Sequence, residues 1–470
     1  MTEQPGPHSK IARASQASPD LVLDIAQSLY DGAHYPDEDI GLAGAIAYLS
    51  GRVGRAYNTP TNAGLNQYIL LLALTGMGKD AVASGISKID AAIAINCPSV
   101  IDFKGPGELV SAPGLIKWLD HKPCVLSVVG EIGKMLKMML APNAPQHLKS
   151  LYRALLQLYS KSGYGETFDP IAYSDRDKNT GVIASPSLTV FGESVPAAFY
   201  EALDEGMIGD GLLPRFMVFE AVGRRQYRQK SAANYQPPAP LVQHLSDVTA
   251  HCLGLMHRRE CQRVDWTPEA EARFDEFDKW ATDAINAEKS QVTRELWNRA
   301  NLKALKLASV RAIGQNYVKP VITLAHTDWA TNLIVAQTNN LITKFSNGEV
   351  GEKAGNQSEQ QRLVLWAISE FLQNYNDLEK FFPGNRGYEY ASQGVVPYAH
   401  ISQRIAGYAA FKNDRLGARN ALKNTINELL KENAFICEVP AAQMGTMFGG
   451  KGRGFIMAES QAILQILNRT

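Results

Sequence analysis

The stretch "QYILLLALTGMGKDAVASG", residues 67–85, combines three local signals that decide the fold. Residues 68–74 form an apolar run of strand length, Gly76 and Gly78 follow, and a helical pattern begins after Lys79. A buried strand, a glycine turn that ends in Gly-Lys and a helix are the order of a phosphate-binding loop. The simpler alternative is a strand-turn-helix unit that carries a surface lysine.

Two positions of this loop differ from the usual G-x-x-x-x-G-K-[S/T] pattern. Ala73 stands where the first glycine is expected, and Asp80 follows the lysine in place of a hydroxyl residue. Mg²⁺ prefers oxygen ligands, so we expect Asp80 to hold the metal directly or through water. The alternative is that Asp80 caps the first turn of the helix. The predicted nucleotide contacts are Thr75, Gly76, Met77, Gly78, Lys79, Asp80 and Ser194.

A second segment, "KPCVLSVVGEIGKML" at residues 122–136, has the form of a Walker B strand. Its apolar run ends in Glu131, which we expect to polarise the water that attacks the γ-phosphate of ATP. An aspartate usually precedes this glutamate and helps to hold Mg²⁺, but the residue here is Gly130. We therefore expect Asp80 to replace both missing metal groups.

The spacing of further apolar runs predicts an α/β fold. The candidate strands are residues 68–74, 99–103, 124–129, 187–191 and 216–221. Helical patterns separate most of them, and this alternation predicts a mostly parallel sheet of the RecA-like P-loop NTPase type. The fourth run is followed by Glu193 and Ser194, at the end of a strand where parallel sheets place functional residues. These two side chains either sense the γ-phosphate and water or cap a loop.

An arginine precedes the fifth strand in "EGMIGDGLLPRFMVFE", residues 205–220. We expect Arg215 to act on the nucleotide of a neighbouring subunit, as an arginine that stabilises transition-state charge in trans. Arg299 is a weaker candidate for the same role. The alternative for Arg215 is a buried salt bridge that fixes the loop.

Bulk composition limits the class of protein. Lys+Arg and Asp+Glu are balanced at 47 each, which excludes a generally basic nucleic-acid-binding chain. The five cysteines form no C-x-x-C pair, which fits a reducing cytoplasm, and the run at 68–74 is too short to cross a membrane. The predicted regions are a disordered leader (1–18), a helical N-terminal region (19–60), a RecA-like core (61–222), a linker and helical region (223–350) and a winged-helix domain (358–470).

The chain after the core reads as mostly helical. Thr267 and Pro268 predict a helix start, and "LWNRANLKALKLASVRAIG" at 296–314 predicts one amphipathic helix. Helical patterns at 361–375, 396–408 and 416–435 precede two short strand patterns at residues 436–440 and 454–459. That order predicts the C-terminal winged helix-turn-helix.

Two segments are candidates for DNA contact. Residues 159–181 combine basic and tyrosine residues between the Walker B strand and the fourth predicted strand, a composition that can follow a single strand of DNA or form a solvated hairpin. The pattern at 416–435 leaves basic residues on one side of a helix, followed by the basic tip "FGGKGRGF". Such a module can equally serve protein–protein contact. The predicted DNA-binding residues are Lys161, Arg176, Lys178, Arg419, Lys423, Lys451 and Arg453.

The motifs taken together resemble a prophage-associated family of P-loop proteins, which are often encoded with or fused to primases and described as primase-helicases. The resemblance covers residues 21–336 and includes an acidic residue after the loop lysine. It implies a RecA-like ATPase that uses ATP and Mg²⁺, most simply a ring-forming, hexameric DNA helicase of phage or plasmid replication. Gly130 departs from the more frequent aspartate, and no primase motif is present in the sequence.

Three functions follow from these observations. The first is a DNA-dependent ATPase that forms a homo-oligomeric ring and translocates on DNA, with Lys79, Glu131 and Arg215 as its catalytic residues. The second is an ATP-switched replication initiator, loader or regulator that binds DNA through its winged helix and hydrolyses ATP poorly. The third is a non-catalytic adaptor that recruits a primase or another replication protein.

Overall fold

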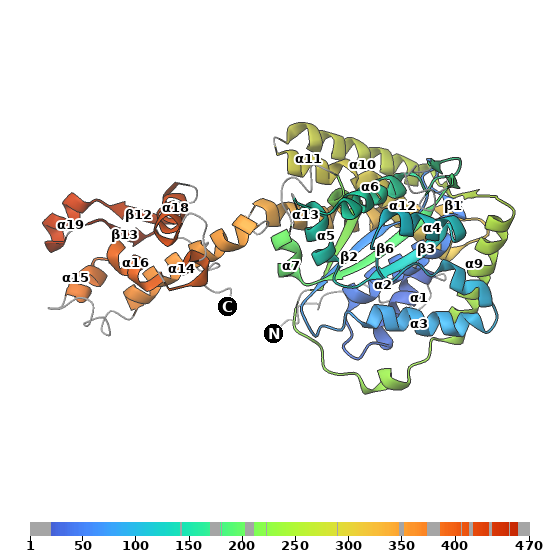
Figure 1. The fold of residues 1–470 in the computed structure, drawn as a ribbon, viewed down its shortest axis with the longest axis horizontal. Helices are drawn as coiled ribbons and strands as arrows, with labels where there is room; N and C mark the ends of the chain where they lie inside the picture. Colours follow the sequence, from blue (N-terminus) through green and yellow to red (C-terminus); the bar gives the residue numbers. More distant parts are fainter. Residues whose placement is uncertain are drawn as a thin grey trace. The chain divides into compact units, whose positions relative to one another are not determined.

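The computed structural model describes residues 20–141, 143–169, 179, 181–202, 211–221, 223–288, 290–346, 352–373, 386–405, 407–412, 417–431, 435–450 and 452–458. The chain divides into two compact units, Met1–Lys344 and Phe345–Thr470. The first is a mixed α/β unit with a parallel central sheet and many helices, and it contains all the predicted nucleotide contacts (Figure 1). The predicted subdivision of this part at residues 60 and 222 stays a prediction.

Four parallel strands form the central sheet in the order β3-β6-β2-β7. Their bounds are Tyr68–Ala73 for β2, Cys124–Val129 for β3, Ser187–Ser194 for β6 and Phe216–Ala221 for β7. These four predicted strands are confirmed. Each is an apolar run without alternation because helices cover both faces of the sheet.

The remaining predicted strand, at residues 99–103, is wrong. Residues Pro98–Phe103 form a 3-10 helix, η1, and only Lys104 makes a single parallel bridge, to Leu126 of β3. The buried positions of η1 are Val100 and Phe103, while Ile101 is exposed. A spacing of three fits a 3-10 turn, whereas a strand needs alternate or continuous burial.

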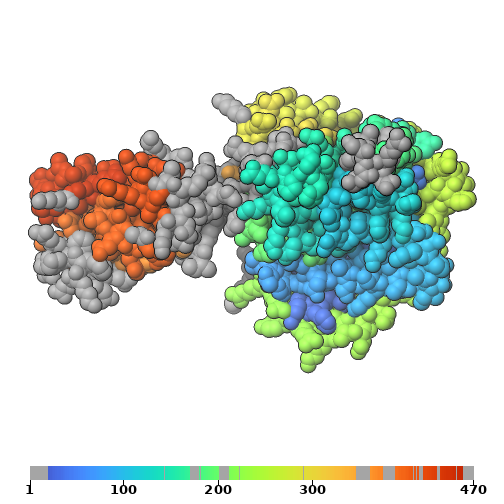
Figure 2. Space-filling model, in the orientation of Figure 1, coloured from blue at the N-terminus to red at the C-terminus, as the bar shows by residue number. Residues whose placement is uncertain are grey.

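The two faces of the sheet pack against different helices (Figure 1). Alternate residues of β2, including Ile69 and Leu71, join the largest hydrophobic cluster with the N-terminal helices. The helices of this face are α1 (Leu21–Asp31), α2 (Glu38–Val53) and α3 (Ala81–Ala94). The opposite face carries α5 (Ile132–Leu140), α6 (Gln146–Ser160) and α7 (Pro196–Ala202). Residues of α3 form a band across the surface of this unit in Figure 2.

Helices after the sheet extend the same core rather than forming a separate one. Residues of α9, α10, α12 and α13 belong to the hydrophobic cluster that contains β2. Thr267 accepts a hydrogen bond from the Ala270 amide at the start of α10, which confirms the predicted cap. The single helix predicted at 296–314 is wrong, because Arg299 (φ −107°, ψ 3°) leaves helical geometry and separates α11 from α12.

The remaining elements of the first unit are short connections and the helices after the sheet. Their bounds are β1 Tyr57–Asn58, α4 Ala112–His121, β4 Thr167–Phe168, β5 Ile183–Ala184, η3 Leu213–Arg215, η4 Lys230–Asn234, α9 Ala239–His257, β8 Gln262–Arg263, β9 Asp265–Trp266, α10 Pro268–Ala287, α11 Gln291–Asn298, α12 Ala300–Gln315, β10 Val321–Ile322 and α13 Leu324–Ser346.

The second unit has its own hydrophobic core and a three-stranded antiparallel sheet in the order β11-β13-β12. The predicted strand pair is confirmed by the pairing of β12 with β13, whereas β11 and the helix α19 between β12 and β13 were not predicted. Its elements are α14 Glu352–Gln373, α15 Arg386–Ser392, β11 Val395–Pro397, α16 Tyr398–Ile405, α17 Ala409–Lys412, α18 Ala418–Lys431, β12 Ile436–Val439, α19 Ala441–Phe448 and β13 Gly454–Met457. The winged-helix interpretation stays a prediction.

Candidate nucleotide site

The loop between β2 and α3 has a backbone that only glycine accommodates easily. Gly76 (φ 83°) and Gly78 (φ 89°) both have positive φ. An added Cβ at Gly78 would lie 2.5 Å from the Tyr35 carbonyl oxygen, so this position has neither the conformation nor the room for a side chain. The glycine pattern of the sequence is therefore required by the geometry of the turn.

Backbone donors of this loop are available to a ligand. The N–H groups of Gly76, Gly78, Lys79 and Asp80 have no hydrogen-bond partner in the part of the chain that the structure describes. Asp80 precedes α3, and its side chain makes no capping hydrogen bond with the helix. A row of unpaired N–H groups before a helix N-terminus is an arrangement that binds phosphate oxygens.

Lys79 reaches from the loop to the neighbouring strand. Its Nζ donates a hydrogen bond to the Ser194 carbonyl oxygen at the end of β6, over 3.4 Å. This contact is long and its acceptor is neutral, so a phosphate oxygen would replace it with a stronger, charge-assisted bond. The hydroxyl of Ser194 instead donates to the Val195 carbonyl oxygen at 3.3 Å, and the Ser194 residue is buried.

Glu193 interacts with the other charged groups at the carboxyl ends of the strands. Burial raises the pKa of its carboxyl group to about 7, Lys79 lowers it, and the carboxylates of Asp80 and Glu131 raise it further. A carboxyl group that gains and loses its proton near neutrality is a candidate proton acceptor. The strand pattern alone named Glu193 only as an alternative to Ser194.

Glu131 follows β3 in a left-handed conformation, with φ 50° and ψ 33°. Such a backbone is uncommon for a residue other than glycine and occurs often at functional sites. Its side chain is 58% exposed and forms an ion pair with Lys134 at 3.1 Å. Gly130 beside it has no heavy atom within 4 Å of an added Cβ, so an aspartate would fit there.

The strand order gives these groups room for a ligand. β6 lies between β2 and β3, with Leu72 paired to Ser194 and Val129 paired to Gly192. Since neighbouring strands lie about 4.8 Å apart, the ends of β2 and β3 are separated by roughly 10 Å. A gap of this size accommodates a phosphoryl group and a water molecule between Lys79 and Glu131.

Arg215 lies at the other end of the strands, where the parallel strands begin. It immediately precedes β7, whereas Lys79 follows the carboxyl end of the parallel strand β2. Six residues of strand span roughly 20 Å, so Arg215 does not reach a phosphate bound beside Lys79 of the same chain. Its guanidinium donates to the Gly211 carbonyl oxygen, and its buried Nε has no hydrogen-bond partner among the residues that the structure describes.

Other cations surround Arg215, and no acid pairs with them among the described residues. Burial lowers the pKa of Arg215, and the positive charge of Arg299 lowers it further. Burial also lowers the pKa of Lys306 to about 7, again with contributions from Arg299 and Arg215, and that of Lys303 to about 8. Within the described ranges Arg215 forms no ion pair, and its role on a neighbouring copy stays a prediction.

Oxygen acceptors of the core hold the two buried lysines in place. Lys306 Nζ donates to the Asn66 backbone oxygen (3.1 Å) and side-chain oxygen (2.8 Å), and lies 4.1 Å from the centre of the Tyr159 ring. Lys303 Nζ donates to the Phe216 carbonyl oxygen at 3.3 Å. Sequence reasoning missed these residues, although two lysines three positions apart in an otherwise apolar helical pattern were a visible signal.

The predicted DNA-gripping segment, residues 159–181, is described in part. Tyr159 is buried in the core and is not available for base stacking, which corrects that part of the prediction. Lys161 forms an ion pair with Glu166 at 2.7 Å, and the strands β4 and β5 pair as an antiparallel hairpin. Arg176 and Lys178 lie outside the described residues.

The basic residues of the second unit differ in their surroundings. Arg419 and Lys423 are exposed on α18, whereas Leu422 and Ile426 of the same helix are buried. Arg453 instead forms an ion pair with Glu438 at 3.3 Å and lies over the ring of Tyr398. Lys451 lies outside the described residues.

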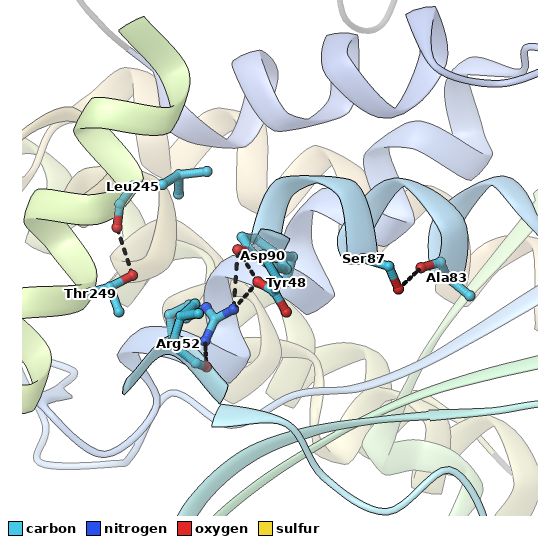
Figure 3. Close-up of polar contacts among 8 residues, drawn as sticks. Tyr48, Arg52, Ala83, Ser87, Asp90, Leu245 and Thr249 are labelled. Atoms are coloured by element: carbon cyan, nitrogen blue, oxygen red, sulfur yellow. Dashed lines mark hydrogen bonds and ion pairs between the residues drawn. The ribbon is translucent and has the colours of Figure 1, made fainter. Parts of the chain in front are cut away.

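A cavity of about 420 Å³ lies away from the phosphate loop, between α2, α3 and η1. Figure 3 shows the buried guanidinium of Arg52 beside it, bonded to Tyr48, Asp90 and the Val100 carbonyl oxygen. The Tyr48 hydroxyl donates to Asp90 at 2.7 Å. These contacts join α2 to α3 and η1, and they leave Arg52 bonded within its own chain.

Comparison with known proteins identifies no family. No family model matches the chain, and no curated protein matches it. Among solved structures the chain is similar to the full-length MCM homolog from Methanopyrus kandleri, with 13% sequence identity and a TM-score of 0.34. The match covers 68% of this chain and 58% of that chain. A likeness of this size carries no argument about activity, and nothing in these comparisons supports the specific prophage family.

The residues of the loop fit a magnesium nucleotide. The described part of the chain contains no cluster of three or more side chains able to hold a metal by themselves. Mg²⁺ usually takes only one or two protein carboxylates and completes its shell with water and phosphate oxygens. Asp80 and Glu193 are carboxylates that act on one another beside Lys79, which suits that mode of binding.

No described helix has the length and apolar character of a membrane span.

Proposed function

We propose that the chain is an ATP hydrolase of the P-loop type, coupled to DNA as a ring-forming helicase. One observation carries the nucleotide part: Lys79, Asp80, Glu131 and Glu193 gather at the carboxyl ends of three parallel strands, beside a loop of unpaired N–H groups. The same ends of the strands combine N–H donors that can bind phosphate oxygens, a carboxylate that can bind Mg²⁺ and carboxylates that can activate a water molecule.

The loop residues have separate tasks in this proposal. The amides of residues 76–80 bind the phosphate oxygens, and Lys79 exchanges the Ser194 carbonyl oxygen for the β- and γ-phosphates. Mg²⁺, when bound, would neutralise phosphate charge and orient the reacting group. Asp80 is the residue that would hold it, directly or through water.

Two carboxylates are placed to activate water. Glu131 is exposed at the end of β3 and can turn from Lys134 towards the gap beside β6. Glu193 has the pKa suited to accept a proton near neutrality. We propose that Glu131 orients the water and that Glu193 receives or relays its proton.

Arg215 serves a neighbouring copy in this proposal. Its distance from the Lys79 edge rules out a role in its own nucleotide site, and the cations around it favour a negative partner. A homo-oligomeric ring, with a hexamer favoured, brings the Arg215 edge of one copy to the nucleotide edge of the next. The transition-state charge would then be stabilised in trans.

DNA contacts are proposed for both units. Residues 159–181 would follow a single strand in the channel, with Lys161, Arg176 and Lys178. The second unit would act as a winged helix, whose exposed Arg419 and Lys423 on α18 contact phosphates or bases. Its partner is DNA, and recruitment of a primase stays a secondary proposal.

Phosphate release from ATP tests the enzymatic part, with and without single-stranded DNA. We expect turnover that DNA stimulates in the wild type, a loss of at least 100-fold in Glu131→Gln, and about a tenfold loss with a changed pH profile in Glu193→Gln. Lys134→Ala is the matched control, because it frees Glu131 without removing it. Wild-type turnover that persists in both glutamine variants would contradict the assignment.

An ATP-switched DNA-binding protein is the second candidate, because Gly130 removes the usual metal carboxylate and Glu131 is paired with Lys134. It predicts tight binding of ATP with negligible release of phosphate. An adaptor without nucleotide chemistry predicts no binding of ATP at all. One titration with ATP, followed by the turnover assay, separates the three functions.

DNA affinity tests the second unit. We expect Arg419→Ala and Lys423→Ala each to weaken binding of the whole chain to duplex DNA and to lower the slope of log affinity against log salt by about 1. Arg453→Ala is the matched control, since its charge is already paired with Glu438. Equal losses in all three variants would contradict a specific role for α18.

A further inference from the structure

The segment after β7, residues 223–235, lies against the loop that joins α1 and α2. The Gln229 amide donates to the His34 carbonyl oxygen at 2.8 Å, and the Gln229 side chain donates to the Asp31 carbonyl oxygen at 3.2 Å. The Tyr235 hydroxyl bonds to the Ser28 hydroxyl at 3.1 Å. We call this segment the strap, and it runs along the lower edge of the first unit in Figure 1 and Figure 2.

A second anchor joins the strap to the helix that follows the phosphate loop. Lys88 Nζ of α3 donates to the Ala232 carbonyl oxygen at 3.3 Å. The strap is thus fixed to α3 as well as to the loop between α1 and α2. The sequence predicts only a linker here, because the polar and basic composition of the strap gives no sign of these contacts.

The strap brings one arginine to the phosphate loop. The guanidinium carbon of Arg225 lies 3.5 Å from the centre of the Tyr35 ring. An added Cβ at Gly76 would lie 3.7 Å from Arg225 Nη1, and one at Gly78 would meet the backbone of Tyr35. Arg225, Tyr35 and the two loop glycines therefore form one contiguous group.

The N–H donors of this guanidinium make no hydrogen bond with any described residue. Arg225 makes no hydrogen bond or ion pair within the described ranges, and its residue is exposed. The Tyr35 ring occupies one face of the guanidinium and leaves its coplanar N–H donors free. A guanidinium fixed in this way matches the oxygens of a phosphate group in a two-point contact.

We propose that Arg225 binds the polyphosphate chain of the nucleotide in the site of its own chain. This inference rests on the proposed nucleotide function and adds a cation that the loop motif does not include. Arg225 of the strap then approaches the phosphate loop beside Gly76, whereas Lys79 of the loop itself follows Gly78. The affinity for a nucleotide should consequently increase more steeply with its number of phosphates than it would if Lys79 were the only cation in contact with them.

Calorimetric titration of the full-length chain with ATP, ADP and AMP tests this assignment. We expect Arg225→Ala to weaken ATP about tenfold and ADP several-fold, and to change AMP by less than twofold. Arg225→Lys keeps the charge but loses the planar fork, so it should recover part of the ATP affinity. Tyr35→Leu removes the stacking surface and should weaken ATP by about threefold.

Arg224→Ala is the matched control, because it removes the same charge from the same exposed segment. Arg224 has no stacking partner or hydrogen bond among the described residues. Its ATP affinity should stay within twofold of the wild type. Thermal unfolding of both variants should match the wild type, since both side chains are on the surface.

The outcomes separate this inference from the function on which it rests. Failure of the wild type to bind any of the three nucleotides would overturn both. Wild-type binding that Lys79→Ala abolishes, with Arg225→Ala equal to Arg224→Ala, would overturn only the role of Arg225. An equal loss for ATP and AMP in Arg225→Ala would also overturn it, because the contact would then be to the nucleoside.

Discussion

The strands of the central sheet have charged groups at both ends, and the two ends differ in charge and in burial. We call them the carboxyl edge and the amino edge. At the carboxyl ends of the strands, Lys79 and three carboxylates lie near one another, partly exposed to solvent. At the amino ends, Lys303 and Lys306 are buried with Arg215 and Arg299 nearby, and no acid pairs with them among the described residues. The carboxyl edge mixes acidic and basic groups and is partly exposed, whereas the amino edge buries basic groups, and burial lowers the pKa of both lysines.

This difference indicates a division of work within one sheet. The carboxyl edge is built on a turn of glycines with free amides, which suits a ligand that comes and goes. The amino edge is built on buried hydrogen bonds such as those of Asn66, which must form when the chain folds. We therefore expect substitutions at the carboxyl edge to change nucleotide binding and those at the amino edge to change stability.

The largest effect should come from Asn66→Ala at the amino edge. The Asn66 amide donates to the Leu158 and Leu188 carbonyl oxygens, and its side-chain oxygen accepts from Ser162 and Lys306. Removing a fully buried group with these bonds should lower the free energy of unfolding by about 3 to 5 kcal/mol. Chemical unfolding followed by circular dichroism measures it.

Asn298→Ala provides the comparison for that variant, because Asn298 is exposed and its change should stay within about 0.5 kcal/mol. Molecules of Asn66→Ala that remain folded should bind ATP with wild-type affinity. A large loss of ATP affinity in folded Asn66→Ala would break the division between the edges.

Gly78→Ala should be the most damaging change at the carboxyl edge. The added Cβ would require a left-handed alanine and would lie 2.5 Å from the Tyr35 carbonyl oxygen, at a cost of about 3 kcal/mol unless the loop moves. If it moves, the amides no longer point to one phosphate. We expect a loss of ATP binding of at least 100-fold in titration calorimetry.

Gly130→Ala is the control on the same edge, since nothing lies within 4 Å of its added Cβ. It should leave ATP affinity within about twofold and stability within about 0.5 kcal/mol. Normal ATP binding by Gly78→Ala would show that the turn is not the phosphate site.

The buried lysines predict a dependence of stability on pH. The pKa of Lys306 falls to about 7 and that of Lys303 to about 8 in the folded chain, below the ordinary value of 10.5, chiefly through burial. Above these values the unfolded chain binds more protons, so the free energy of unfolding rises with pH. We expect an increase of about 2 to 3 kcal/mol between pH 7.5 and pH 9.

Lys306→Met isolates one contribution, because methionine fills a similar volume without the charge. The rise with pH should fall by about half in this variant, measured by urea unfolding at several pH values. A rise of unchanged size would mean that Lys306 does not carry it, and a flat profile in the wild type would contradict the burial of both charges.

Gly130→Asp should have the smallest effect and addresses metal binding. A carboxylate fits beside Glu131 without a close contact and would supply the usual metal ligand. We expect the Mg²⁺ concentration at half-maximal turnover to fall about threefold to tenfold, or about 1 kcal/mol. Gly130→Asn is the neutral control, and an equal fall in both variants would exclude a charge effect.

Local patterns predicted the parts of the fold in which one segment decides its own structure. The four apolar runs became strands β2, β3, β6 and β7, and the glycine turn took the backbone that its residues require. The prediction of a strand was wrong at residues 99–103, where the buried residues are three positions apart in a 3-10 helix. The prediction of one helix was wrong at Arg299, where a single residue separates two helices. Composition does not report these details.

The candidate site divides in the same way. Lys79 and Glu131 belong to short motifs and could be found in the sequence, whereas the environment of Glu193 depends on charges from three separate segments. The contact of Lys306 with Asn66 and the approach of Arg225 to Gly76 join positions far apart in the chain. No local pattern contains that information.

The position of β2 inside the sheet also governs when the phosphate loop can form during synthesis. Tyr68 pairs with Val190 of β6 and Phe216 of β7, and both described partner strands of β2 follow it in the chain. Strand β2 can therefore pair on both sides only after about 150 more residues have been translated, and distant pairing of this kind closes slowly. A nascent chain that stops before β7 would expose this run, so truncated products should engage chaperones or aggregate before any nucleotide can bind.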